Sequence, residues 1–256
     1  MAEEEKIREH AKHALQALTD KTKKWKDRIK DFLWEVFIIL VAVNITLWFH
    51  NWSDKRHERA QVKEFLISTR ESLIQDTTNI RNYITFMTNE TLVYYDSILS
   101  QIHRNEINTL YIDSHSGLLL NDRSVIPNYS FYQSFNSNNN LRLIENRKLL
   151  NDIISLYSAS FPNFQANMKA FTDMRFAGFE KYIGTKTPFD SNGIKLSQIL
   201  NQLDVKYLIQ ISDFFIIDLN RQSKNLIEQI AAIIQEIDQE LKTKYGYKEK
   251  IDKALP

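Results

Sequence analysis

The sequence predicts an all-α protein in which one transmembrane helix is continuous with a long helix of an elongated antiparallel helical bundle. Phe32 to Trp52 is a mostly apolar run, and about 20 such residues span a bilayer core of about 30 Å as a helix. Neither Gly nor Pro occurs before Gly117, so nothing interrupts a long helix there. Apolar residues then recur at spacings of three and four along two long segments, which is typical of buried helix faces.

The apolar run has the flanks of a membrane span. Trp34 lies near its start and Trp48 and Trp52 near its end, and tryptophan concentrates at the two membrane interfaces. A cleaved signal peptide is the first alternative, but it would have a short apolar region and a small-residue cleavage site. The exit His50–Lys55 offers no such site, and the paired tryptophans argue against a buried core helix. The run is therefore interpreted as an uncleaved signal anchor.

Flanking cations predict the orientation. The positive-inside rule counts Lys and Arg, and the margin is six to four for a cytoplasmic N-terminus. We therefore expect a bacterial inner-membrane protein with a cytoplasmic amphipathic helix at 1–31, a transmembrane helix at 32–52 and a periplasmic helical domain at 53–256. The counted residues are Lys21, Lys23, Lys24, Lys26, Arg28 and Lys30 before the span, and Lys55, Arg56, Arg59 and Lys63 after it.

The N-terminal segment from Lys6 to Phe32 has one apolar face and one charged face that is rich in Lys in its second half. One interpretation is an amphipathic helix lying on the anionic cytoplasmic leaflet. The other is a helix that packs on itself or on a partner as a short coiled coil. Both alternatives remain open on the sequence alone.

After the span, a seam of apolar residues continues without a breaker to about Arg104, which predicts one helix running from the membrane into the domain. Asp76 lies on this seam, where it either fixes the register or caps a neighbour, or contacts a ligand. The seam consists of Val62, Leu66, Thr69, Leu73, Asp76, Ile80, Tyr83, Met87, Thr91, Tyr94, Ile98 and Ile102.

The middle of the chain predicts loops and shorter helices. Between Asn105 and Asn140 the helical period is lost, and Thr109 to Ile112 forms a weak candidate strand. Further elements are expected in this order: a helix from Leu141 with an Asn-rich N-cap, a break or kink at Pro162, a helix from Phe164 to Tyr182, a loop marked by Gly184, Pro188 and Gly193, and a short helix from Leu196 to Leu203.

The last long helix is predicted from Val205 to Tyr245, with Gly246 ending it. Two long helices cannot bury both apolar seams by themselves, so either the middle helices or a second copy of the chain must cover them. The seam of this helix is read as Leu208, Ile211, Phe215, Leu219, Leu226, Ile230, Ile233, Ile237 and Leu241.

Parts of the sequence resemble a family of single-span membrane proteins common in Bacteroidota. The span of that family ends Asn-Asn-Trp-Asn-Glu-x-Arg, which is similar to His50–Arg56 here, and its next helix resembles Glu64–Leu73. A central patch resembles Asn138–Asn146 and the helix Leu149–Tyr157, with Asn138-Asn139 in place of the usual Ser-Gly. The resemblance implies a single span and brings no activity with it.

We predict no catalytic, cofactor-binding or metal-binding residues. The sequence has no Gly-rich phosphate loop, zinc-protease motif or nucleophile elbow, and it has no cysteine. A net charge of +1 gives no overall attraction to nucleic acid. The paired histidines His10 and His13 are predicted to be solvated; His50 and His57 either sense pH or are solvated at the interface. Glu236, Asp238 and Glu240 are expected on the solvated flank of the last helix.

Polar residues within the span predict protein contacts. Ala42 and Thr46 lie within about 20° of Glu35 around a helix, and Asn44 lies on the opposite face. Two polar stripes favour contacts with other helices over a monomer surrounded by lipid.

The chain is therefore predicted to be non-enzymatic and to need no cofactor. Its expected role is that of a scaffold or accessory subunit of a membrane protein complex. The expected partners are membrane lipid and either further copies of the chain or another integral membrane complex, without nucleic acid. The alternative is an extracytoplasmic ligand-sensing bundle that signals through a partner.

Overall fold

The computed structural model describes residues 8, 9, 12, 25–121, 123–182, 189, 190 and 193–247. The first long helix, α2, spans Trp25–Phe86, and the last, α8, spans Leu203–Tyr245. The fold is all-α, which confirms the predicted class. By packing, the chain divides into unit 1, residues 1–61, and unit 2, residues 62–256, and the boundary falls within α2. The predicted amphipathic helix at 1–31, with His10 and His13, lies mostly outside the described residues.

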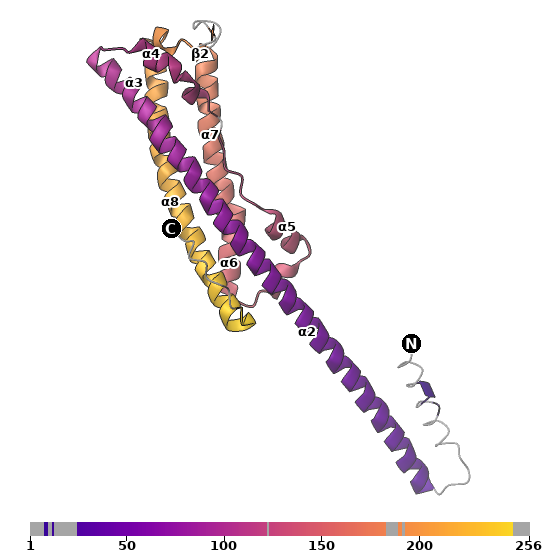
Figure 1. The fold of residues 1–256 in the computed structure, drawn as a ribbon. Coiled ribbons are helices and arrows are strands. Elements are labelled where there is room, and N and C mark those ends of the chain that lie inside the picture. The colour runs from indigo at the N-terminus through magenta and orange to yellow at the C-terminus, as the bar shows by residue number, and fades with distance from the viewer. Residues whose placement is uncertain are drawn as a thin grey trace. The chain divides into compact units, whose positions relative to one another are not determined.

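In unit 2 the chain passes through π turns and short helices between α2 and α8 (Figure 1). After α2 come the π turn η1 (Met87–Leu92), α3 (Val93–Arg104), α4 (Thr109–Ser114), the 3₁₀ helix η2 (Ser116–Leu120), α5 (Ser130–Ser137) and η3 (Asn140–Leu143). Next come α6 (Arg147–Ser155), the π turn η4 (Leu156–Ser160), α7 (Phe161–Glu180), the paired two-residue strands β1 (Phe189–Asp190) and β2 (Gly193–Ile194), and η5 (Leu196–Gln198).

Helix α8 runs antiparallel to the α6–α7 segment. Near its start Asp204 pairs with Lys181, at its middle Gln222 accepts a hydrogen bond from Asn167, and near its end Glu240 accepts one from Asn146. Figure 1 shows α3 beside the first half of α8, and Arg70 of α2 contacts Asp238 near the other end. The α2–α3 segment therefore also runs antiparallel to α8.

Three helical segments, α2–α3, α6–α7 and α8, supply most of the described core of unit 2. The predicted seam of α2 and α3 is buried from Val62 to Ile98, and Ile102 is partly buried. The α6–α7 segment covers both long helices with residues such as Leu149, Phe161 and Phe171. Of the two alternatives for covering the seams, the middle helices fill this role within a single chain.

The predicted seam of α8 is correct in the second half of the helix and off by about one position in the first. Leu208, Ile211 and Phe215 are only partly buried. The buried line contains Val205, Ile209, Ser212 and Ile216 instead. Because Ser212 is polar, this line does not stand out as apolar in the sequence, and the neighbouring line of Leu208, Ile211 and Phe215 predicts a seam more clearly.

Two predicted loops contain helices. The candidate strand at Thr109–Ile112 is part of α4, because the Asn108 side chain accepts the backbone N–H of Tyr111 and caps a first helical turn. The polar run at Ser134–Asn140 contains the end of α5. The predicted loop at Gly184 and Pro188 lies outside the described residues, and Leu196 begins the single turn η5 rather than a helix that reaches Leu203.

Helix ends follow the residue chemistry. Gly246 ends α8 with a φ of 58°, as predicted for a glycine at this position. Asn105 and Asn139 adopt the same left-handed region, which asparagine tolerates better than most residues. Pro162 lies in the first turn of α7, directly after η4, and there it needs no hydrogen-bond partner for its nitrogen.

Candidate functional site

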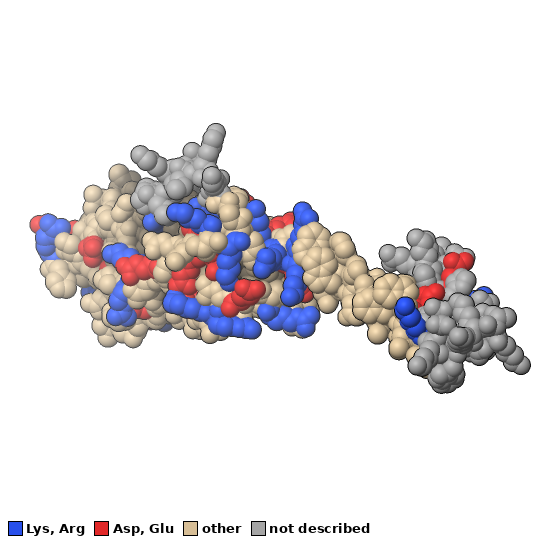
Figure 2. All heavy atoms as spheres, turned by 90° about the horizontal axis from the view of Figure 1, so that it is seen from below, with Lys and Arg blue, Asp and Glu red and all other residues tan. Residues whose placement is uncertain are grey.

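One helix among the described residues is long and apolar enough to cross a membrane, and its apolar stretch lies in α2 after Phe32. None of that stretch is buried within the structure. Figure 2 shows it as a largely uncharged surface, in contrast to the mixed charges on unit 2. Trp34, Trp48 and Trp52 are 64%, 62% and 50% exposed, so the three indoles are free to contact lipid headgroups.

The polar residues of this stretch are bonded within their own helix. The Thr46 hydroxyl donates to the carbonyl of Ala42 at 2.9 Å, and the Asn44 amide donates to the carbonyl of Leu40 at 2.7 Å. Thr46 therefore needs no partner helix for its proton, whereas Asn44 retains an amide oxygen and a second N–H for other contacts. Glu35 is partly buried near the start of the stretch.

His50 and His57 lie on the exposed surface of α2. The Nδ1 atom of His50 is 3.6 Å from a carboxylate oxygen of Asp54, and Nε2 of His57 is 3.0 Å from the side-chain nitrogen of Gln61. Neither ring lies in a buried environment that would make it a sensitive pH sensor. The surface of this part of α2 fits the solvated alternative better.

A buried arginine holds the short helix η2 of unit 2 in place. Arg175 of α7 is 2% exposed, and its guanidinium donates to the carbonyls of Leu118, Leu119 and Asn121. The guanidinium carbon also lies 4.3 Å from the centre of the Phe171 ring, a favourable cation–π geometry. Arg175 thus fixes η2 and the residue that follows it against α7.

Tyr95 belongs to the same polar cluster. Burial raises the pKa of Tyr95, and the nearby guanidinium of Arg175 and hydroxyl of Ser212 oppose that rise. Burial also raises the pKa of Tyr83 to about 12, again opposed by Arg175. Tyrosines around this cation therefore remain protonated phenols at physiological pH.

Asp76 is a second buried charge, and it contacts the loop before α5. Both of its carboxylate oxygens accept the backbone N–H of Asn128 at 3.2 Å, and the Asn128 side chain donates to Ser72. Burial raises the pKa of Asp76 from its ordinary value to about 6, and the bond from Asn128 partly offsets this. Asp76 in turn contributes to the raised pKa values of Tyr129 and Tyr157, which face it. The predicted register role describes this contact better than a ligand role.

Replacing this carboxylate should change how stability depends on pH. Between about pH 4 and pH 6 the folded state holds a proton on Asp76 that the unfolded state has lost, so the free energy of unfolding falls as pH rises through this window. The raised pKa of Asp76 corresponds to a loss of at most about 3 kcal/mol in the free energy of unfolding. Asp76→Asn removes the ionisation cost, so we expect it to gain stability relative to the wild type between pH 4.5 and pH 7.5.

Urea unfolding in lipid nanodiscs, followed by far-UV circular dichroism at both pH values, measures this difference. Asp173→Asn, on the exposed surface of α7, is the matched control, and its difference from the wild type should stay constant. If the free energies of unfolding of Asp76→Asn and the wild type differ by the same amount at both pH values, the raised pKa of Asp76 is contradicted.

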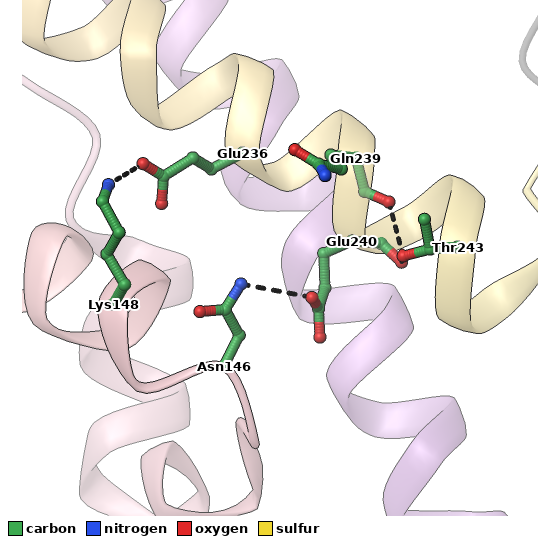
Figure 3. A pocket seen from close by; sticks show the side chains of 6 residues that line it. All are labelled: Asn146, Lys148, Glu236, Gln239, Glu240 and Thr243. Atoms are coloured by element: carbon green, nitrogen blue, oxygen red, sulfur yellow. Dashed lines mark hydrogen bonds and ion pairs between the residues drawn. The ribbon is translucent and has the colours of Figure 1, made fainter.

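A polar pocket lies where α6 begins beside the end of α8 (Figure 3). Lys148 pairs with Glu236 and with Asp152, and the Asn146 amide donates to Glu240 at 3.2 Å. The hollow measures about 360 Å³ and is lined by Asn146, Lys148, Glu236, Gln239, Glu240 and Thr243. Its charged groups already have partners, Lys148 with Glu236 and Glu240 with Lys244 and Asn146, so its contacts serve mainly to join the two helices.

The expectation that Glu236, Asp238 and Glu240 are solvated is wrong for Glu240 and holds only in part for Glu236 and Asp238, whose side chains are 23% and 44% exposed. Glu240 is 7% exposed and also pairs with Lys244 at 2.8 Å, and Asp238 accepts from Arg70 at 2.6 Å. These carboxylates face α2 and α6 because α8 is covered on two sides at this end. Sequence periodicity shows only which residues share a face, so a helix packed on two sides buries more than its apolar line.

The sequence analysis does not single out two residues that hold the polar clusters together, Arg175 and Asn128. Arg175 stands on the apolar line of Phe171 and Phe179, and a lone arginine on such a line is the signal that could have revealed it. Asn128 gave no signal, because its contact with Asp76 uses the backbone N–H. Among the described residues no group of three or more histidine, aspartate or glutamate side chains is placed to hold a metal ion.

The chain matches no protein-family model, no curated protein and no solved structure. The resemblance to Bacteroidota single-span proteins therefore stays a prediction.

Proposed function

We propose that the chain is a single-span membrane protein that acts as a non-enzymatic scaffold or accessory subunit of a membrane complex. One observation carries the proposal: no residue of the apolar stretch of α2 is buried, although the apolar seams of unit 2 are covered within the chain. A continuous exposed apolar surface of this length is unfavourable in water and suits a lipid environment. Extraction of membranes with alkaline carbonate tests the anchor, and an anchored chain stays in the pellet.

The proposed location is the bacterial inner membrane, with residues 1–31 in the cytoplasm and unit 2 in the periplasm. The excess of flanking cations before the span supports this orientation. Alkaline phosphatase fused after Pro256 should be active. An inactive phosphatase together with a fluorescent cytoplasmic reporter at the same position would reverse the orientation and leave the anchor intact.

A second surface supports the scaffold role. The start of α8 exposes Leu203, Tyr207, Phe214 and Ile217 at spacings that continue a heptad pattern, opposite its buried line. Because the main seams are buried within the chain, this line and the span are two of the apolar surfaces that the described residues leave open to a partner helix. Affinity purification in mild detergent, with identification of the co-purifying chains, tests whether a partner exists.

The span is proposed to contribute to assembly through Glu35 and Asn44. Replacing both residues by Leu removes polar groups that partner helices satisfy at about 0.6 kcal/mol per hydrogen bond, so association should weaken by a few fold without being lost. Thr46→Val is the control and should leave association unchanged, because the Thr46 hydroxyl bonds within its own helix. Mass photometry in native nanodiscs measures the effect, and a strictly monomeric wild type would contradict it.

A sensor is the second candidate function, and Asp76 is the observation that favours it. This buried carboxylate lies on α2, the helix that also carries the span, and its pKa of about 6 lies in a physiological range. Amide hydrogen exchange of α2 at pH 7.5 and pH 5, expressed as protection factors that remove the intrinsic pH dependence of exchange, tests the candidate. A pH-dependent change in protection that disappears in Asp76→Asn supports a sensor, and equal protection factors at both pH values reject it.

A further inference from the structure

The part of α2 that follows the apolar stretch has two chemically different faces. At about 100° per residue, Trp48, Trp52, Lys55, Arg56 and Arg59 fall within an arc of about 100°. The opposite arc, also about 100° wide, carries a second set of side chains. That set consists of His50, Asp54, His57, Glu58 and Gln61.

The contacts on each face follow this division. On the first face the Arg56 guanidinium lies 5.6 Å from the Trp52 ring centre, and Trp52 and Trp48 each meet Phe49 edge to face. In the described part of the chain no carboxylate pairs with Lys55, Arg56 or Arg59. On the opposite face Asp54 already has His50 as its neighbour. One face therefore presents unpaired positive charge, and the other presents the acidic groups.

The axial spacing of the first face matches a lipid headgroup layer. At 1.5 Å per residue, Lys55 and Arg56 lie about 5–6 Å beyond Trp52 along the helix, and Arg59 lies about 10 Å beyond it. The headgroup region adds about 5–8 Å on each side of the hydrocarbon core, with indole rings at its inner boundary. Lys55 and Arg56 therefore lie at the depth of the lipid phosphates, and Arg59 lies just outside that layer, from where its long side chain can reach back to it.

We propose that this face, Trp48, Trp52, Lys55, Arg56 and Arg59, binds the headgroup of an anionic phospholipid, and that the acidic face does not. The inference rests on the proposed membrane anchor. Three unpaired cations on one face give the charge complementarity that a zwitterionic lipid lacks, and each basic residue at an anionic surface favours binding by about fivefold. The acidic groups on the opposite face keep anionic lipid to one side of the helix.

Quenching of tryptophan fluorescence by brominated lipids tests the proposal. The full-length chain with Trp25→Phe and Trp34→Phe retains only Trp48 and Trp52 as reporters. It is reconstituted in phosphatidylcholine vesicles that contain either brominated phosphatidylglycerol or brominated phosphatidylcholine at equal mole fraction. We expect brominated phosphatidylglycerol to be preferred by about tenfold or more, and we expect the combined Lys55→Gln, Arg56→Gln and Arg59→Gln variant to lose the preference.

The matched control removes charge from the other face. Asp54→Asn with Glu58→Gln should leave the preference for brominated phosphatidylglycerol unchanged. A rise in that preference as large as the loss in the triple variant would show that net charge alone attracts the lipid, and it would overturn the proposal. Equal quenching by both lipids in a chain that resists carbonate extraction would also overturn it, while leaving the anchor intact. Loss of carbonate resistance in the wild type would remove the anchor and this inference together.

Discussion

Replacing Leu40 and Val43 together by lysine is expected to move the protein from the carbonate-resistant membrane pellet to the soluble or aggregated fraction. The two residues are one turn apart near the middle of the apolar stretch, and both are exposed in the structure. A lysine at the centre of a membrane helix costs about 2.5–3.5 kcal/mol by insertion measurements, so two cost about 5–7 kcal/mol. Side chains this far from either interface reach the headgroups poorly, so little of the cost is recovered.

The matched control places the same two lysines on unit 2. Phe214 and Ile217 of α8 have the same three-residue spacing and similar exposure, 66% and 54%. Phe214→Lys with Ile217→Lys adds equal charge to a surface that lies outside the proposed span, so the chain should remain in the pellet. If both double variants behave alike, the apolar stretch of α2 is not the anchor.

Replacing Arg175 by methionine is expected to destabilise unit 2 by about 3–5 kcal/mol. The substitution leaves the carbonyls of Leu118, Leu119 and Asn121 without the donor that now holds them. A hydrogen bond to a charged group contributes about 1.5–3 kcal/mol, and a buried acceptor without a partner adds a desolvation cost. Methionine fills much of the volume of the arginine side chain, so the loss of stability reflects the missing hydrogen-bond donors more than a cavity.

Arg221→Met serves as the control for this prediction, because Arg221 has a side chain that is 74% exposed and pairs with Asp218 on the same helix. Exposed pairs contribute about 0–1 kcal/mol. Urea unfolding in nanodiscs should be followed by far-UV circular dichroism, since all four tryptophans lie before residue 53 and report only on unit 1. Equal loss of stability in both variants would contradict the role assigned to Arg175.

The long helices were predictable because their period is regular. From Val62 to Ile98 every residue of the predicted seam is buried, including Thr69 and Asp76. A repeated spacing of three and four needs no knowledge of the partner surface, because any neighbour must cover that face. The same reasoning placed the end of α8 at Gly246, where local backbone preference decides the outcome.

The predictions are wrong where contacts between residues distant in sequence override the local sequence pattern. Asn108 turns a β-capable segment into the helix α4, and the carbonyl of Ile112 there accepts the hydroxyl of Tyr94 at 2.6 Å. Ser212 and Arg175 occupy core positions that composition assigns to apolar residues, and both lie beside Tyr95. A single sequence does not reveal which polar residues meet across the core.

The π turns η1 and η4 have a consequence for the comparison of related sequences. Each π turn accommodates about one residue more than an α-helical turn, and α8, which packs beside both segments, has none. A related chain with a one-residue deletion within Met87–Leu92 or Leu156–Ser160 would keep the buried faces on both sides of the gap in phase. The same deletion within Val62–Phe86 would rotate every later side chain by about 100°. Alignment gaps of one residue at the π turns therefore indicate a regularised helix, not a different fold.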